Sequence, residues 1–183
     1  MANWLTHLRI SQAVIDKIDS SVDEEKYYIG TIAPDGGKIH FDEKGKKYYE
    51  PPRYISHWTD NISDWDRTIH YERFYDKYVK NETDYIKKSF YLGYYIHLLT
   101  DALWVELVDR PIIENFETIE EFKSKAMKQF KDDWYNTELE YLKNNPNYYP
   151  LKVLSSIKKF DNIYLDYASS EAIQEKIERT LNN

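Results

Sequence analysis

Apolar residues recur along most of this chain at helical spacing, and glycine, proline and charged residues separate the segments that carry them. Residues 4–18 form the first such segment, which predicts a helix with Asn3 as its N-cap. Residues 22–34 predict a second helix, because acidic residues near their start suit a helix N-terminus and a Pro-Asp-Gly-Gly stop follows. The chain is therefore expected to open with two helices in succession.

The same spacing predicts further helices towards the C-terminus, over residues 63–80, 84–108, 118–144, 150–159 and 166–181. Ser63 is the expected N-cap of the first of these, and Ser169 or Ser170 is that of the last. Pro111 is expected to close the helix that begins near residue 84, because proline has no backbone N–H to continue it.

One long irregular stretch, about residues 36–61, interrupts the helical pattern with glycines, prolines and charged residues. Long loops inside a compact domain are often functional. Convincing β-alternation is confined to residues 38–49, which predict a short hairpin. We therefore expect a single all-α domain over residues 1–183, a multi-helix bundle with one long loop.

Composition narrows the classes of function. Among 183 residues there are 25 Lys and Arg against 32 Asp and Glu, a formal net charge of −7, which argues against binding duplex nucleic acid through phosphate neutralisation. The chain has no cysteine, so disulfides, thiolate catalysis and Cys-based zinc fingers are excluded. The 18 tyrosines favour an aromatic helix-packing core over a tyrosine-lined pocket. No stretch is long and apolar enough to span a membrane, and the first residues do not resemble a secretory signal, so the expected location is cytoplasmic.

The helix that contains residues 89–104 carries the most informative polar pair. His97 and Asp101 lie four residues apart within this largely apolar run, so they project from one helix face, one turn apart. Gly93 lies a further turn back, and its lack of a side chain leaves space beside His97. A buried imidazole and carboxylate need partners. Two interpretations remain open at this point: a core histidine that bonds its own Asp101, or a metal site.

Three other residues are candidates for the same chemistry. A metal site needs imidazole nitrogens and carboxylate oxygens that converge from several elements. His7 lies beside the apolar stripe of the first helix, Asp35 follows Ala-Pro at the end of the second, and His57 comes late in the long loop. The ordinary interpretation of Asp35 is a turn aspartate. His40 and His70 have no feature that marks them.

Taken in order, these elements resemble a known family. A first-helix histidine, then Gly-Thr-Ile-Ala-Pro-Asp closing the second helix, then Ser-His, then Tyr-Ile-His-Leu-Leu-Thr-Asp in a central apolar helix are similar to the zinc-dependent phospholipase C family. The fold of that family also resembles the S1/P1-type zinc nucleases. The resemblance covers roughly residues 1–110 and implies an all-α protein with a metal cleft that hydrolyses phosphodiesters.

The resemblance also implies roles for individual residues. Asp35, His57, His97 and Asp101 match the family's complete four-ligand zinc site, and His7 matches the first-helix ligand of a second site that Asp101 helps to hold. The family completes that second site with the amino group and carbonyl of a processed N-terminal tryptophan. Here the chain starts with Met1. Asp35 is also the expected catalytic residue, orienting or deprotonating the attacking water.

The family's third site is not matched. Its pattern continues with further histidines, but this chain has none after His97. Asp132, Asp133 and Glu138 offer only carboxylates on the next long helix, so the site is either lost or rebuilt from oxygens for a harder ion. We therefore expect one zinc ion with four protein ligands rather than the full three-metal cleft.

The expected function is a zinc-dependent hydrolase of phosphoric esters, acting on a phosphodiester, a phospholipid or another small phosphate ester. Metal-activated water is the expected nucleophile. The alternative is a metal-binding or structural module of the same fold with reduced catalysis, which the missing histidines favour. An HD-type phosphohydrolase is disfavoured, because the chain has no adjacent His-Asp pair. The sequence does not indicate an oligomeric state.

Overall fold

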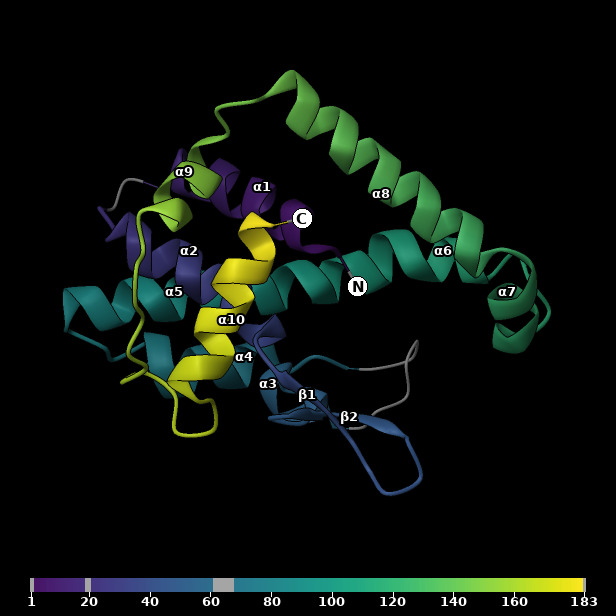
Figure 1. The fold of residues 1–183 in the computed structure, drawn as a ribbon, viewed down its shortest axis with the longest axis horizontal. Helices are drawn as coiled ribbons and strands as arrows, with labels where there is room; N and C mark the ends of the chain where they lie inside the picture. The colour runs from purple at the N-terminus through teal and green to yellow at the C-terminus, as the bar shows by residue number, and fades with distance from the viewer. Residues whose placement is uncertain (1, 19–20, 61–67, 183) are drawn as a thin grey trace.

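A computed structural model describes residues 2–18, 21–60 and 68–182 (Figure 1). The described residues are mostly helical, which confirms the predicted all-α class. The α-helices are α1 (Trp4–Ile15), α2 (Glu24–Ile32), α3 (Arg53–Ser56), α4 (Tyr71–Phe74), α5 (Tyr85–Trp104), α6 (Arg110–Ile113), α7 (Ile119–Lys125), α8 (Met127–Asn144), α9 (Tyr149–Ser155) and α10 (Ser170–Leu181). A 3₁₀ turn, η1 (Ala33–Asp35), follows α2, and two π-helical turns, η2 (Tyr75–Val79) and η3 (Val105–Asp109), follow α4 and α5.

The long helix α5 lies at the centre of the molecule, where α1, α2 and α4 pack against it (Figure 1). The C-terminal helix α10 packs on α2 and η1 and so brings the end of the chain close to its beginning. Aromatic side chains fill much of the core. The rings of Phe74 and Tyr94 stack with centroids 4.6 Å apart, and those of Phe90 and Tyr164 with centroids 4.3 Å apart.

Two glycines allow α2 and α5 to cross in backbone contact. A Cβ atom placed on Gly93 would lie 1.9 Å from the carbonyl oxygen of Tyr27, and one placed on Gly30 would lie 2.0 Å from that of Phe90. Any side chain at either position would therefore force the helices apart. The space predicted beside His97 is thus filled by the backbone of α2, and this contact positions the functional site described below.

The predicted hairpin is confirmed. Strand β1 (Lys38–Phe41) pairs with β2 (Lys47–Glu50) in antiparallel register, with Ile39 opposite Tyr49. Gly45 occupies the turn with a φ of 76°, a left-handed conformation that glycine adopts without strain. The rest of the stretch predicted as a loop is more ordered than expected, because the short helix α3 follows the hairpin.

Several helix boundaries differ from the prediction, among them those of the helices before and after residue 84. In the described part of the helix predicted over residues 63–80, α4 begins at Tyr71, because Ile69 is held in an isolated β-bridge with Thr59. The predicted cap Ser63 lies outside the described residues. Pro111 does not close the central helix: the π-turn η3 follows α5 directly, and Pro111 then lies in the first turn of α6.

Helix boundaries also differ in the second half. The helix predicted over residues 118–144 is divided at Ala126, whose φ of −127° separates α7 from α8. The helix predicted over 150–159 ends at Ser155, and the last helix begins at Ser170 instead of residue 166. Ser169 is its N-cap and accepts a hydrogen bond from the backbone N–H of Ala172. Among the described residues no helix is long and apolar enough to cross a membrane.

Candidate metal centre

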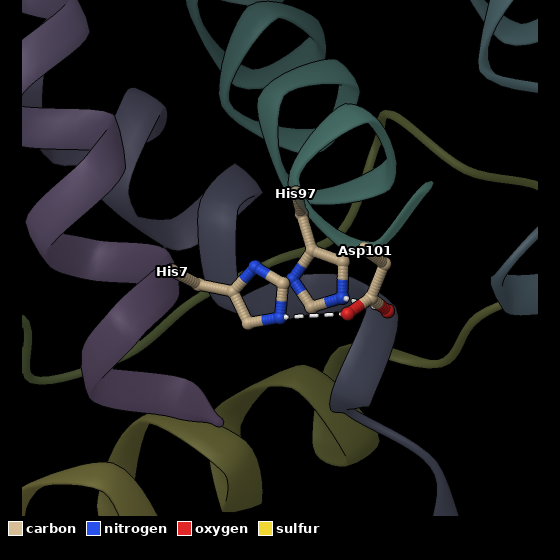
Figure 2. Close-up of side chains that lie close together, drawn as sticks. All are labelled: His7, His97 and Asp101. Carbon is tan, nitrogen blue, oxygen red and sulfur yellow. Dashed lines mark ion pairs between the residues drawn. The ribbon is translucent and has the colours of Figure 1, made fainter. Parts of the chain in front are cut away.

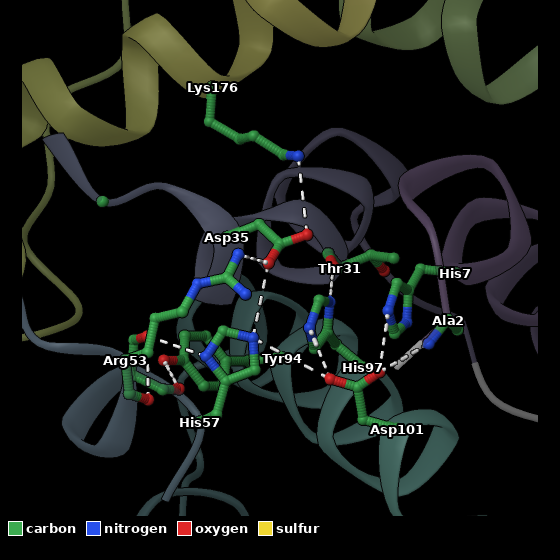
Figure 3. Close-up of polar contacts among 12 residues, drawn as sticks. Ala2, His7, Thr31, Asp35, Arg53, His57, Tyr94, His97, Asp101 and Lys176 are labelled. Atoms are coloured by element: carbon green, nitrogen blue, oxygen red, sulfur yellow. Dashed lines mark hydrogen bonds and ion pairs between the residues drawn. The ribbon is translucent and has the colours of Figure 1, made fainter. Parts of the chain in front are cut away.

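The five candidate residues meet at one place, although they come from four separate parts of the chain (Figure 3). His7 projects from α1, Asp35 from η1, His57 from the end of α3, and His97 and Asp101 from α5. The side chains of the three histidines and of Asp101 are each about 1% exposed, whereas that of Asp35 is 17% exposed. Asp35 is therefore the member of this cluster that reaches solvent most readily.

The contact between α2 and α5 orients His97. Its Nδ1 lies 2.7 Å from the carbonyl oxygen of Thr31, and because a carbonyl can only accept, Nδ1 carries the proton and donates it. Thr31 lies in the last turn of α2, where carbonyls lack partners within the helix. The lone pair of the neutral ring is thereby placed on Nε2, which lies 3.6 Å from Oδ2 of Asp101.

His7 and Asp101 form the second part of the cluster (Figure 2). The ring of His7 stacks on that of His97, with centroids 3.7 Å apart and planes 6° from parallel. Its Nε2 lies 3.3 Å from Oδ1 of Asp101. The backbone N–H of Ala2 donates to the same oxygen over 3.1 Å. Asp101 therefore presents one oxygen to His7 and Ala2, and its other oxygen to His97.

His57 and Asp35 form the third part. Nε2 of His57 lies 3.3 Å from Oδ1 of Asp35 and 3.8 Å from Oδ2 of Asp101. Nδ1 of His57 lies 2.9 Å from the hydroxyl of Ser56, which can itself donate to the carbonyl of Arg53, 3.5 Å away. The hydroxyl of Tyr94 donates to the Ser56 carbonyl over 2.5 Å. These contacts hold the imidazole of His57 with its Nε2 towards the two carboxylates.

The electrostatics of the cluster keep both carboxylates ionised and His97 neutral. Burial alone would raise the pKa of Asp101, but His7 and the other imidazoles outweigh it and lower that pKa. Burial opposes ionisation of Asp35 as well, yet the ammonium of Lys176 and the nearby imidazole of His57 hold the pKa of Asp35 well below the usual range. Burial, followed by the neighbouring His7, lowers the pKa of His97 well below 6.5. Ionised carboxylates and neutral imidazoles are the forms that ligate metals.

The donor atoms left over fit a divalent cation. Among the described residues, Nε2 of His57, Nε2 of His97 and Oδ2 of Asp101 are buried without a hydrogen-bond partner. Leaving several such atoms unpaired is costly, and a shared metal ion would satisfy all of them. Two sets of ligand atoms lie within 4.8 Å of one another in the described chain: His7, His97 and Asp101, and Asp35, His57 and His97. Imidazole nitrogen with carboxylate oxygen is a donor set that zinc accepts.

Two cations at Asp35 were not foreseen from the sequence. Nη2 of Arg53 lies 3.4 Å from Oδ1 of Asp35, and Nζ of Lys176 lies 3.6 Å from Oδ2 (Figure 3). Arg53 lies in the stretch predicted as a loop, and Lys176 lies in the last helix, outside the part of the chain that carries the family resemblance. No spacing signal links either residue to Asp35, because the contacts depend on how distant elements pack.

The carboxylates considered for a third site do not join this cluster. Neither of the two ligand sets found in the described chain includes Asp132, Asp133 or Glu138. Asp132 is exposed and pairs with Lys128, whereas Glu138 is buried beside the first turn of α1. The histidines without a predicted role lie in other ion pairs, His40 with Glu50 and His70 with Asp60.

Comparisons with known proteins complete this description. The sequence model of the family described as zinc dependent phospholipase C matches residues 6–182, which is nearly the whole chain. No curated protein and no solved structure matches the chain significantly. The match extends well beyond the first 110 residues that carry the recognisable motifs.

Proposed function

This chain belongs to the zinc-dependent phospholipase C family, and we propose that it is a zinc-dependent hydrolase of phosphoric ester bonds. The observation that carries this proposal is the buried group of three imidazoles and two carboxylates with unpaired donor atoms. The proposed ligands of one zinc ion are Asp35, His57, His97 and Asp101. His7, together with Asp101, would help to hold a second ion.

A bound zinc ion supplies Lewis acidity, which lowers the pKa of water and polarises a phosphoryl oxygen. The protein's part is to place the groups around it. The Thr31 carbonyl holds the ring of His97, and Ser56 holds that of His57, so both imidazoles are oriented before any ligand binds. Such partners typically change metal affinity by about 10- to 100-fold.

Asp35 is the proposed catalytic residue. Its side chain is 17% exposed, more than that of any other member of the cluster, and its lowered pKa keeps it ionised and able to accept a hydrogen bond from water. In this role Asp35 would orient or deprotonate the water that attacks the phosphorus atom. General base catalysis of this kind contributes about 10²- to 10⁴-fold to a rate.

The proposed substrates are a phosphodiester, a phospholipid or another small phosphate ester. The competing possibility is a metal-binding module of the same fold with reduced catalysis. It is favoured by the absence of any histidine after His97 in the sequence, because the family pattern uses such residues for a further metal. Activity measurements separate the two.

The test is hydrolysis by chelator-free protein loaded with zinc. We expect release of nitrophenol from bis(p-nitrophenyl) phosphate or p-nitrophenyl phosphorylcholine, and a loss of at least about 100-fold in kcat for Asp35→Asn. Asp132→Asn is the matched control, because Asp132 is an exposed carboxylate outside the cluster. If zinc is bound and monoester, diester and phospholipid substrates all remain intact, the module without catalysis is the better account.

A further inference from the structure

Asp35 is contacted by two cationic side chains in addition to the imidazole of His57. Its Oδ1 lies 3.3 Å from Nε2 of His57 and 3.4 Å from the guanidinium of Arg53, and its Oδ2 lies 3.6 Å from the ammonium of Lys176. Figure 3 shows Lys176 reaching Asp35 from one side and Arg53 reaching it from the other. The two cations therefore flank the solvent-facing member of the cluster.

Both cations have hydrogen-bonding capacity to spare. A guanidinium has five N–H donors and an ammonium has three. Arg53 directs Nη2 at Asp35, while its Nε is buried and has no hydrogen-bond partner among the described residues. The guanidinium also lies 4.9 Å from the ring centroid of Tyr49, which supports its position. The side chain of Lys176 is only 13% exposed, although lysine is rarely buried unless its ammonium is paired.

The balance of charge around Asp35 indicates that the N–H donors of Arg53 and Lys176 bind an anion. Asp35 and Asp101 contribute two negative charges, and Arg53 and Lys176 contribute two positive charges, so the charges of these four side chains sum to zero. One divalent ion would raise the total to +2. Ligation of a metal by Asp35 would leave Arg53 and Lys176 with less negative charge beside them, and these two cations would then favour the binding of another anion. A phosphoryl group offers several oxygens for such donors.

We propose that Arg53 and Lys176 form an anion clamp that holds the non-bridging oxygens of the substrate's phosphoryl group beside the metal centre. This inference rests on the proposed function, since it assigns the substrate-binding part of the same site. The clamp supplies the positive charge that an additional metal ion would otherwise bring to the phosphate. Arg53 offers a planar fork of donors, and Lys176 offers a mobile point charge.

The first experiment measures binding without turnover. Phenylphosphonate, which cannot be hydrolysed at its P–C bond, is titrated calorimetrically into zinc-loaded protein after zinc content has been determined. We expect Lys176→Met and Arg53→Met each to weaken its binding by about 10- to 100-fold at unchanged zinc content. Lys176→Arg should restore much of the affinity, and Lys152→Met, an exposed lysine on α9, should bind as wild type does. Wild-type affinity in zinc-loaded Lys176→Met and Arg53→Met would overturn the proposal.

A second experiment needs no metal. In metal-free protein Asp35 neutralises the two cations, so Asp35→Asn should release them and strengthen phenylphosphonate binding at least about 10-fold over metal-free wild type. Adding Lys176→Met to Asp35→Asn should remove that gain. If wild type binds no zinc, the proposed hydrolase function fails, but this comparison still tests the clamp. Equal binding by the single and double variants would overturn it, provided that both retain the thermal unfolding midpoint of a folded protein.

Discussion

Replacing Gly93 by alanine should disrupt the fold and the metal centre together. The new Cβ atom would lie 1.9 Å from the carbonyl oxygen of Tyr27 and 2.9 Å from the backbone N of Thr31. Both are backbone atoms, so no side-chain rotation relieves the clash, and α2 must move away from α5. The same movement withdraws the Thr31 carbonyl from Nδ1 of His97, whose present distance is 2.7 Å.

The magnitude follows from the size of the clash. Ordinary contact requires about 3.4 Å, so the two backbones must separate by roughly 1.5 Å. Overpacking of this kind typically costs about 1–3 kcal/mol, and rigid backbone on both sides places Gly93→Ala near the upper end. Alanine favours the helix by about 1 kcal/mol relative to glycine, so the net loss in the free energy of unfolding is about 2 kcal/mol. For a chain of this length that corresponds to a fall of about 4–8 °C in Tm.

The assay is thermal and urea unfolding of metal-free protein, followed by zinc titration. With a urea m value of about 2 kcal/mol/M, a loss of about 2 kcal/mol moves the midpoint by about 1 M. Zinc affinity should also fall by about 10- to 100-fold, because the imidazole loses its orienting partner. Gly37→Ala is the matched control, since its Cβ would make only ordinary contacts of 3.4–3.5 Å. Equal stability and zinc affinity in Gly93→Ala and wild type would refute the role given to the α2–α5 crossing.

Three further predictions concern charge and metal. Burial raises the pKa of Glu138 from its ordinary value of 4.5 to about 7. Between these two values the folded state holds a proton that the unfolded state has lost, so stability should fall as the pH rises through that window. The difference in urea midpoint between about pH 5 and about pH 8 should therefore be smaller in Glu138→Gln than in wild type, and equal differences would contradict this. His57→Asn should lose the bound zinc while His7→Asn retains one ion per chain by elemental analysis, and the reverse result would make His7 a ligand of the main site. Chelation should lower Tm by about 5–11 °C if free zinc is about 100 times its Kd, and an unchanged Tm would count against a metal bound to the folded state.

Local patterns predicted most of the helices and the chemistry of the central one. The four-residue spacing of His97 and Asp101 placed both on one helix face, and the structure confirms that they lie together. Polar caps such as Asn3 and Ser169 mark helix starts, because their side chains satisfy free N–H groups of the first turn. The motif order placed Asp35 and His57 with them, and the structure brings these residues together as well.

What the sequence could not predict depends on long-range packing or on small changes in helix winding. Arg53 and Lys176 look like ordinary surface charges until α10 packs against η1 and brings Lys176 to Asp35. The π-turn η3 produces no recognisable pattern of apolar residues in the sequence. Pro111 was therefore expected to end a helix that in fact continues past it. The sequence indicated that Gly93 leaves space beside His97. That α2 fills this space, with Gly30 at the same crossing of α2 and α5, could not be inferred from one helix alone.

The most direct test of the metal centre is an anomalous difference map measured at the zinc edge on crystals of protein that was purified without chelators. Elemental analysis of the same preparation accompanies it. The account predicts at least one zinc ion per chain, with its peak about 2.0–2.2 Å from Nε2 of His57, Nε2 of His97 and a carboxylate oxygen of Asp35 and of Asp101. Protein without a stoichiometric metal, and a map without a peak among these side chains, would contradict it.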